Sequence, residues 1–123
     1  MTVASNFAMR ARRSRFQVAP KIERTVDGIT FASKKEAARY GLLKLREKIG
    51  EIVDLKLQPK FPVDIGGERL CVYTADFSYY DRRLGRVVIE DSKSTGTAKD
   101  AAYRLRKKAA ELAHGITVDE VFG

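Results

Sequence analysis

Apolar residues recur every three or four positions in two stretches of the chain, which is the spacing of an amphipathic α-helix. The first predicted helix follows a capping box formed by Ser33 and Glu36 and runs to about residue 48. The second covers residues 99–114 and ends at Gly115, a good helix terminator. The stripes expected to face the core are Ala38, Leu42, Leu45 and Ile49 in the first helix and Ala102, Leu105, Ala109 and Leu112 in the second.

Shorter apolar segments between and after these helices predict β-strands. Pro59 follows the first strand and implies an edge strand or a break, because proline cannot donate to a strand ladder. Gly66 and Gly67 predict a hairpin turn, because glycine accepts positive φ angles. The predicted strands cover residues 52–57, 69–79, 86–91 and 116–121, and residues 61–65 form a short extended piece. The expected fold is therefore α/β (α+β), in the order αβββαβ, with a central mixed sheet flanked by helices.

The chain is strongly basic. The 123 residues fit one domain, and 24 Lys and Arg against 16 Asp and Glu give a net charge of +8. Such a charge favours a polyanionic partner such as nucleic acid, with a basic but inert surface as the alternative. We expect residues 1–24 to form a flexible basic arm and residues 25–123 to form the domain. The candidate nucleic-acid contacts of the arm are Arg10, Arg12, Arg13 and Arg15.

Cys71 is the only cysteine, which excludes an intramolecular disulfide and a cysteine-based zinc site. No apolar run reaches the roughly 18 residues that cross a bilayer, and the first residues lack the apolar core of a signal peptide. These features favour a cytoplasmic protein that does not interact with membranes.

Acidic residues lie near the facing ends of two neighbouring predicted strands. Asp76 lies in the strand over residues 69–79, and Asp91 and Lys93 close the next strand. Alternation places Asp91 and Lys93 on one face and Glu90 on the other, so Asp91 is the preferred ligand and Glu90 the reserve. Two adjacent carboxylates repel unless a cation lies between them. Mg²⁺ prefers such oxygen ligands, and Mn²⁺ can substitute for it. The pattern predicts a metal site for phosphodiester cleavage, with Lys93 facing a phosphate or a water.

The second predicted helix is basic and begins shortly after Lys93, so it can guide a phosphate backbone toward the metal, with a solvated helix face as the alternative. Tyr103 on this helix either stacks on a base or packs in the core. Gln58 either supports the site as a polar side chain or is an ordinary loop amide. The other candidate nucleic-acid contacts in the domain are Lys34, Lys35, Lys99, Arg104 and Lys107.

Asp76, Asp91 and Lys93 resemble the acid, acid and lysine of the PD-(D/E)XK nuclease superfamily, although Ala75 stands in place of its usual proline. The resemblance covers roughly residues 29–121. The chain is more closely similar to small phage-encoded nucleases of the Holliday junction resolvase type. The segments that carry this similarity are residues 31–37, 50–52, 58–59, 73–77 and 91–93.

The resemblance implies a restriction-endonuclease-like core and a Mg²⁺-dependent DNA endonuclease, selective for branched DNA in phage recombination or packaging within a bacterial host cell. It implies a homodimer that makes paired cuts, and a metal site completed by Glu36 on the first helix. Two other functions stay open. One is a non-catalytic nucleic-acid-binding protein with a degenerate nuclease fold, and the other is a basic structural protein in which Asp76 and Lys93 are salt-bridge partners.

Overall fold

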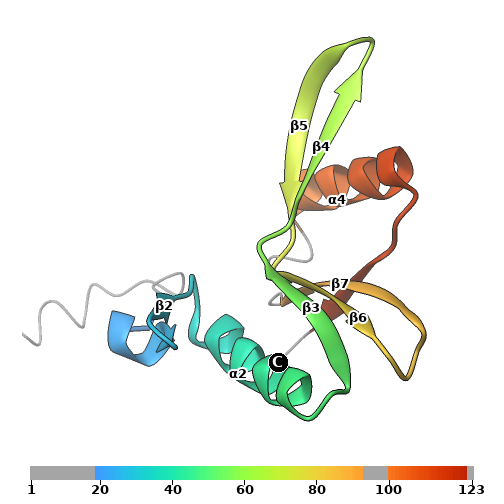
Figure 1. Cartoon of the computed structure of the whole chain (residues 1–123). Helices are drawn as coiled ribbons and strands as arrows, with labels where there is room; N and C mark the ends of the chain where they lie inside the picture. Colours follow the sequence, from blue (N-terminus) through green and yellow to red (C-terminus); the bar gives the residue numbers. More distant parts are fainter. Residues whose placement is uncertain (1–18, 93–99, 122–123) are drawn as a thin grey trace, which may run out of the picture.

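The computed structural model describes residues 19–92 and 100–121, which form an α+β arrangement (Figure 1). A short 3-10 helix, η1, precedes the first strands, and the described residues form two α-helices, α2 and α4. The elements are η1 (Lys21–Arg24), β1 (Thr25–Val26), β2 (Ile29–Thr30), α2 (Lys34–Lys48), β3 (Ile52–Leu57), β4 (Lys60–Ile65), β5 (Glu68–Thr74), β6 (Phe77–Asp81), β7 (Arg86–Ser92), α4 (Ala101–His114) and β8 (Val118–Val121).

The central sheet has four strands in the order β3-β6-β7-β8. β6 is antiparallel to both of its neighbours, β3 and β7. β8 runs parallel to β7 after the crossover through α4. One apolar cluster packs α2 against the sheet through Leu43, Ile52 and Phe77. A second cluster packs α4 on the other side through Ala110, Ile89 and Val118. The prediction of a central mixed sheet flanked by helices is therefore confirmed.

The predicted single strand over residues 69–79 is wrong, because the chain bends at Ala75 and Asp76 and forms two strands, β5 and β6. β3 and β4 are interrupted at the same level, at Gln58 and Pro59. Backbone hydrogen bonds join the two bends: the Gln58 amide donates to the Asp76 carbonyl at 2.8 Å, and the Ala75 amide donates to the Pro59 carbonyl at 3.1 Å. The segments 52–65 and 68–81 thus form one long, kinked hairpin.

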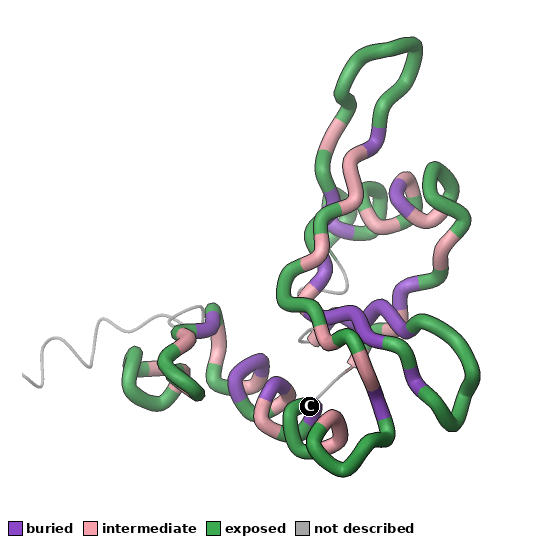
Figure 2. Tube along the Cα trace, viewed as in Figure 1, coloured by how far each residue is buried: buried purple, intermediate pink, exposed green. Residues whose placement is uncertain are grey.

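The kink sends the two halves of this hairpin to different places. Its base, β3 with β6, belongs to the central sheet, while its outer half, β4 with β5, is a separate two-stranded sheet that projects over α4 (Figure 1). Buried residues gather where β6 and β7 pass beneath the hairpin (Figure 2). Among the described residues five strands lie between α2 and α4, so the order αβββαβ is wrong in its number of strands.

The predicted helices both exist, but each turns a different face to the core from the one expected. In α2 the buried apolar residues are Ala37, Tyr40 and Leu43, whereas Leu45 is 57% exposed. In α4 the buried residues are Tyr103 and Ala110. The expected stripes are largely exposed, with Leu42, Ile49, Leu105 and Leu112 on the outside. None of the helices within the described ranges is long and apolar enough to cross a membrane.

Residues 19–30 cover the start of α2. The part of the predicted arm that the structure describes includes η1, where the Arg24 guanidinium donates to the carbonyls of Ala19 and Phe31 at 2.8 and 2.6 Å. β1 and β2 form a tight hairpin through Asp27 and Gly28, both with positive φ. The rest of the predicted arm, residues 1–18, lies outside the described residues.

The orientation of α2 predicts unequal costs for two leucine truncations. Leu43→Ala leaves a cavity in the core and should lower the free energy of unfolding by about 2–5 kcal/mol. Leu45→Ala removes an exposed side chain and should change it by less than about 0.5 kcal/mol. Urea unfolding of dilute protein, followed by circular dichroism, measures both. A larger loss in Leu45→Ala than in Leu43→Ala would contradict this orientation.

Candidate active site

Asp76 and Asp91 lie side by side at the end of the β6–β7 pair. The Asp76 amide donates to the Asp91 carboxylate at 3.0 Å, and the Ser92 amide donates to the Asp76 carboxylate at 2.6 Å. These reciprocal bonds extend the ladder in which Phe77 pairs with Glu90. Asp76 lies at the bend between β5 and β6, where its amide also donates to the Glu90 carbonyl at 3.1 Å and its carboxylate reaches across to Ser92 on the neighbouring strand. The structure therefore brings together the two acids that the sequence singles out.

Asp91 is fully buried, and its carboxylate is surrounded by hydrogen-bond donors. The hydroxyls of Tyr73 on β5 and Tyr103 on α4 both donate to Oδ2, the latter at 3.2 Å. Burial, followed by the hydrogen bond to Asp91, raises the pKa of Tyr73. Burial, followed by the charge of Asp91, raises the pKa of Tyr103. Both phenols therefore stay neutral and serve the carboxylate as donors.

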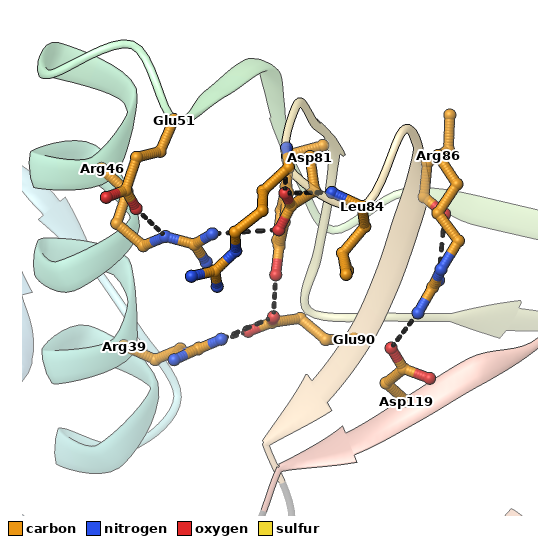
Figure 3. A network of polar contacts seen from close by, with 11 residues as sticks. Arg39, Arg46, Glu51, Asp81, Leu84, Arg86, Glu90 and Asp119 are labelled. Atoms are coloured by element: carbon orange, nitrogen blue, oxygen red, sulfur yellow. Dashed lines mark hydrogen bonds and ion pairs between the residues drawn. The ribbon is translucent and has the colours of Figure 1, made fainter.

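Glu90 points to the opposite face of the sheet, toward α2 (Figure 3). Arg39 forms a two-pronged ion pair with its carboxylate, with N–O distances of 2.6 and 2.9 Å. The Tyr79 hydroxyl donates to the same carboxylate at 2.7 Å. The alternation that favoured Asp91 over Glu90 is confirmed. The reserve role of Glu90 stays a prediction, and α2 and β6 already supply partners to this carboxylate on the far side from Asp91.

A second ion pair sets the direction of α2 along β7. Arg46 donates to Asp81 at 3.0 Å and to Glu51 at 2.9 Å, near the start of β7 (Figure 3). The amide hydrogen bond from Leu84, together with Arg46, lowers the pKa of Asp81. Because Arg46 lies near the start of β7 and Arg39 near its end, the first turn of α2 points to the end that carries Asp91.

Glu36 lies in that first turn, three residues before Arg39, and only 5% of it is exposed. The capping interaction predicted for Ser33 is confirmed, since its hydroxyl accepts from the Glu36 amide at 3.0 Å. Within residues 19–92 and 100–121, however, no three His, Cys, Asp or Glu side chains are grouped to hold a metal ion. The structure therefore pairs Asp76 with Asp91 and places Glu36 at the same end of the sheet, without assembling all three.

Gln58 supports the site through its backbone. It has a positive φ of 49°, and its amide donates to the Asp76 carbonyl, which fixes the bend that carries Asp76. The Gln58 residue itself is exposed. This contact comes from the main chain, so the predicted role of the Gln58 side chain stays a prediction.

The predicted nucleic-acid contacts have different surroundings. Tyr103 is 5% exposed and bonded to Asp91, so the prediction that it stacks on a base is wrong and its packing alternative is confirmed. Arg104, the next residue, is exposed beside a pocket of about 380 Å³ between α4 and β8. Lys107 lies 3.6 Å from Glu111, and Lys34 lies 3.4 Å from Glu23. Lys35 is half-buried in the first turn of α2.

Several predicted site residues lie outside the described residues, so the structure does not place them. These are Arg10, Arg12, Arg13, Arg15, Lys93 and Lys99. Lys93 directly follows Ser92, whose amide already bonds to Asp76. The last residue of β7, Ser92, therefore lies next to the carboxylates of Asp76 and Asp91.

The chemistry of this donor set suits a hard divalent cation. Mg²⁺ keeps several waters and is commonly held by only one or two carboxylates together with substrate phosphates. Asp76 and Asp91 provide two such carboxylates. The Ser92 hydroxyl is also buried and lacks a hydrogen-bond partner among the described residues. Buried polar atoms are rarely left unsatisfied, so this atom fits a position next to a bound water or ligand.

Sequence reasoning missed Tyr73 and Ser92. Tyr73 falls in the strand predicted over residues 69–79, three positions before Asp76, and the sequence pattern gave it no role. Its contact with Asp91 depends on the bend, which turns β5 over α4 so that Tyr73 and Tyr103 meet with ring centroids 6.2 Å apart. Ser92 lies between the two predicted residues Asp91 and Lys93, and its amide, which the sequence does not distinguish, makes the contact.

Comparison with known proteins gives one match. The model of a family described as "Protein of unknown function (DUF1064)" matches residues 13–115, which include Glu36, Asp76, Asp91 and Lys93. No curated protein and no solved structure matches the chain.

The buried phenols predict an alkaline limit to stability. Burial, followed by the hydrogen bond to Glu90, raises the pKa of Tyr79 to about 12, and the pKa values of Tyr40, Tyr73 and Tyr103 are also raised. The pKa of a tyrosine in the unfolded chain is about 10. Each phenol whose pKa is higher in the folded protein therefore stabilises the fold below that pH. This contribution should be lost as pH rises through about 12 for Tyr79.

Ultraviolet absorbance of phenolate and circular dichroism, recorded together during an alkaline titration, test this expectation. Most of the phenolate signal should appear with the loss of folded structure. Tyr79→Phe should remove one of the late-titrating groups. Ionisation of all five tyrosines near pH 10 in a protein that stays folded would contradict it.

Proposed function

The chain belongs to the DUF1064 family, whose function is unknown, and we propose from its site that it is a divalent-metal-dependent DNA endonuclease. The observation that carries the proposal is the pair of reciprocal amide–carboxylate bonds that hold Asp76 and Asp91 together at the end of β7. Burying Asp91 beside a second carboxylate costs free energy unless donors or a cation compensate both charges. Such an unfavourable placement of two carboxylates is typical of a functional site.

Each residue has a distinct task in this proposal. Asp76 and Asp91 would hold Mg²⁺ or Mn²⁺, with Glu36 reaching the site from α2. The ion, when bound, would acidify a water and offset the charge that develops on the phosphate. Lys93, which follows β7 directly, would contact the scissile phosphate or orient the attacking water. Arg104 on α4 would hold the flanking phosphate backbone.

DNA is the proposed substrate because the chain carries a net charge of +8. The sequence does not resemble a base-reading recognition module, which favours selection by DNA structure, such as branched DNA, over selection by base sequence. Paired cuts in two strands need two sites, so we also propose a homodimer. The exposed apolar side chains Leu42, Leu45 and Ile49 on α2 support it, because monomers seldom expose contiguous apolar patches without a function.

Cleavage of labelled DNA tests the proposed activity. The substrates would be a four-way junction, a fork, a flap, a linear duplex and a single strand, each with Mg²⁺, Mn²⁺ or EDTA. We expect metal-dependent cleavage, and a rate lowered about 100-fold or more in Asp76→Asn, Asp91→Asn and Lys93→Ala, because each removes a group that stabilises charge in the transition state.

The control is Glu68→Gln, which changes an exposed carboxylate at the outer end of the projecting hairpin. It should cleave at the wild-type rate. Binding without cleavage on every substrate would replace the proposed activity by the non-catalytic nucleic-acid-binding function. Full activity in Asp91→Asn would mean that Asp91 is only a structural residue.

Binding in the absence of cleavage tests the role of α4. Arg104→Ala should weaken binding to every DNA sequence and lower the slope of log K against log salt by about 0.9, as expected for one lost phosphate contact. Arg83→Ala is the matched control, because Arg83 lies in the exposed turn between β6 and β7, at the opposite end of β7 from Asp91. Fluorescence anisotropy in EDTA at several salt concentrations measures both. Equal losses in the two variants would contradict a specific role for α4.

A further inference from the structure

Two tyrosines from separate parts of the fold converge on one oxygen of Asp91. Tyr73 comes from β5 in the projecting hairpin, and Tyr103 from the first turn of α4. Both hydroxyls donate to Oδ2, while the Asp76 amide donates to Oδ1 at 3.0 Å. The two oxygens of this carboxylate therefore have different surroundings: Oδ2 faces the phenols and Oδ1 faces Asp76.

Three donors placed around a buried carboxylate fix the plane of that carboxylate. A single donor would leave it free to rotate about χ2, which is a broad torsion in Asp. Oδ2 is held by the Tyr73 hydroxyl and by the Tyr103 hydroxyl, which also lies within reach of Glu120. Rotation would break these hydrogen bonds to a buried charge, and such bonds are among the stronger ones in proteins. Asp91 is thereby held with Oδ1 toward Asp76.

The hydroxyls are not needed for packing alone. Tyr73 and Tyr103 lie in the apolar cluster with Val63, Ala75 and Ile89, where phenylalanine would fill nearly the same volume. Burying a hydroxyl there is unfavourable unless it bonds. Here each hydroxyl reaches Asp91, and the hydroxyl of Tyr103 also lies 2.9 Å from Glu120 on β8.

Glu120 holds the Tyr103 hydroxyl from the other side. A phenol has one hydrogen, so Asp91 and Glu120 compete for it as acceptors. This places the Tyr103 oxygen between two strands, β7 and β8, and links the edge strand of the sheet to the carboxylate pair. The position of Asp91 thus depends on three elements beyond its own: β5, α4 and β8.

We propose that Tyr73 and Tyr103 are positioning residues that orient the Asp91 carboxylate for binding a divalent cation. The inference rests on the proposed function, and it adds the residues that determine the affinity of the site for metal. Groups that hydrogen-bond to a metal ligand typically change metal affinity about 10- to 100-fold when they are removed. Tyr73→Phe and Tyr103→Phe should each do so.

The experiment measures Mn²⁺ binding to the full chain without DNA by isothermal titration calorimetry. Wild type, Tyr73→Phe, Tyr103→Phe and Asp91→Asn are compared, and circular dichroism establishes that each variant is folded. We expect Kd for Mn²⁺ to rise about 10- to 100-fold in each Phe variant. The Mg²⁺ concentration that gives half-maximal cleavage should rise by a similar factor, while the rate at saturating Mg²⁺ changes less. A merely structural role would not separate these two quantities.

Tyr79→Phe is the matched control. It removes a buried hydroxyl that donates to the neighbouring carboxylate, Glu90, on the opposite face of the sheet. It should leave Kd for Mn²⁺ unchanged. An equal rise in Tyr79→Phe would overturn the inference, because it would show a general effect of losing buried hydroxyls.

The outcomes distinguish this inference from the proposed function. If wild type binds Mn²⁺, Asp91→Asn does not, and both Phe variants bind as tightly as wild type, the positioning role is overturned and the proposed function stands. If wild type neither binds Mn²⁺ nor cleaves DNA, the proposed function fails and this inference fails with it. Two independent Phe variants keep the test decisive where one of them does not fold.

Discussion

Two adjacent buried carboxylates on β7 hold the two sides of the fold together. Glu90 and Asp91 point to opposite faces of the sheet, as neighbouring residues of a strand must, and each is satisfied by the helix on its own side. Arg39 reaches Glu90 from α2, and Tyr103 reaches Asp91 from α4. Breaking a buried ion pair such as that of Arg39 with Glu90 typically costs about 3–5 kcal/mol. A buried carboxylate such as Asp91 also costs free energy when it loses a donor, so both helices are constrained in position. Their apolar contacts add stability, but the acids define where each helix lies along β7.

The bends in the long hairpin determine where Tyr73 and Asp76 lie. A straight strand over residues 68–81 would keep Asp76 in regular pairing and would carry Tyr73 away from α4. The bends at Gln58–Pro59 and Ala75–Asp76 occur at the same level, and hydrogen bonds between the two main chains join them. As a result the outer half of the hairpin covers α4, and Asp76 lies at the bend between β5 and β6, at the place where β7 ends. The same bend thus brings Tyr73 and Asp76 to Asp91 from different directions.

The agreement between sequence and structure differs from one element to another. The end of α4 at Gly115 and the cap of α2 at Ser33 were predictable because both depend on residues close by in the chain. The β1–β2 hairpin was missed, although Asp27 and Gly28 between β-branched residues are a typical turn signal. The buried face of α2 was misassigned because the helix is apolar on two sides. Leu42 and Leu45 satisfy helical spacing as well as Tyr40 and Leu43 do, and spacing alone does not tell which set meets a sheet.

The sequence by itself determined the turns, the helix ends and the alternation that separates Asp91 from Glu90, because these follow from local backbone geometry and from neighbouring side chains. It also singled out Asp76 and Asp91 as a pair. Only the tertiary structure decided which faces of α2 and α4 are buried, where the long hairpin bends, and that two tyrosines share one carboxylate oxygen. These features depend on the summed free energy of contacts between residues far apart in the chain, such as Tyr73 with Asp91 and Arg39 with Glu90. A local pattern of residue types does not determine this summed free energy.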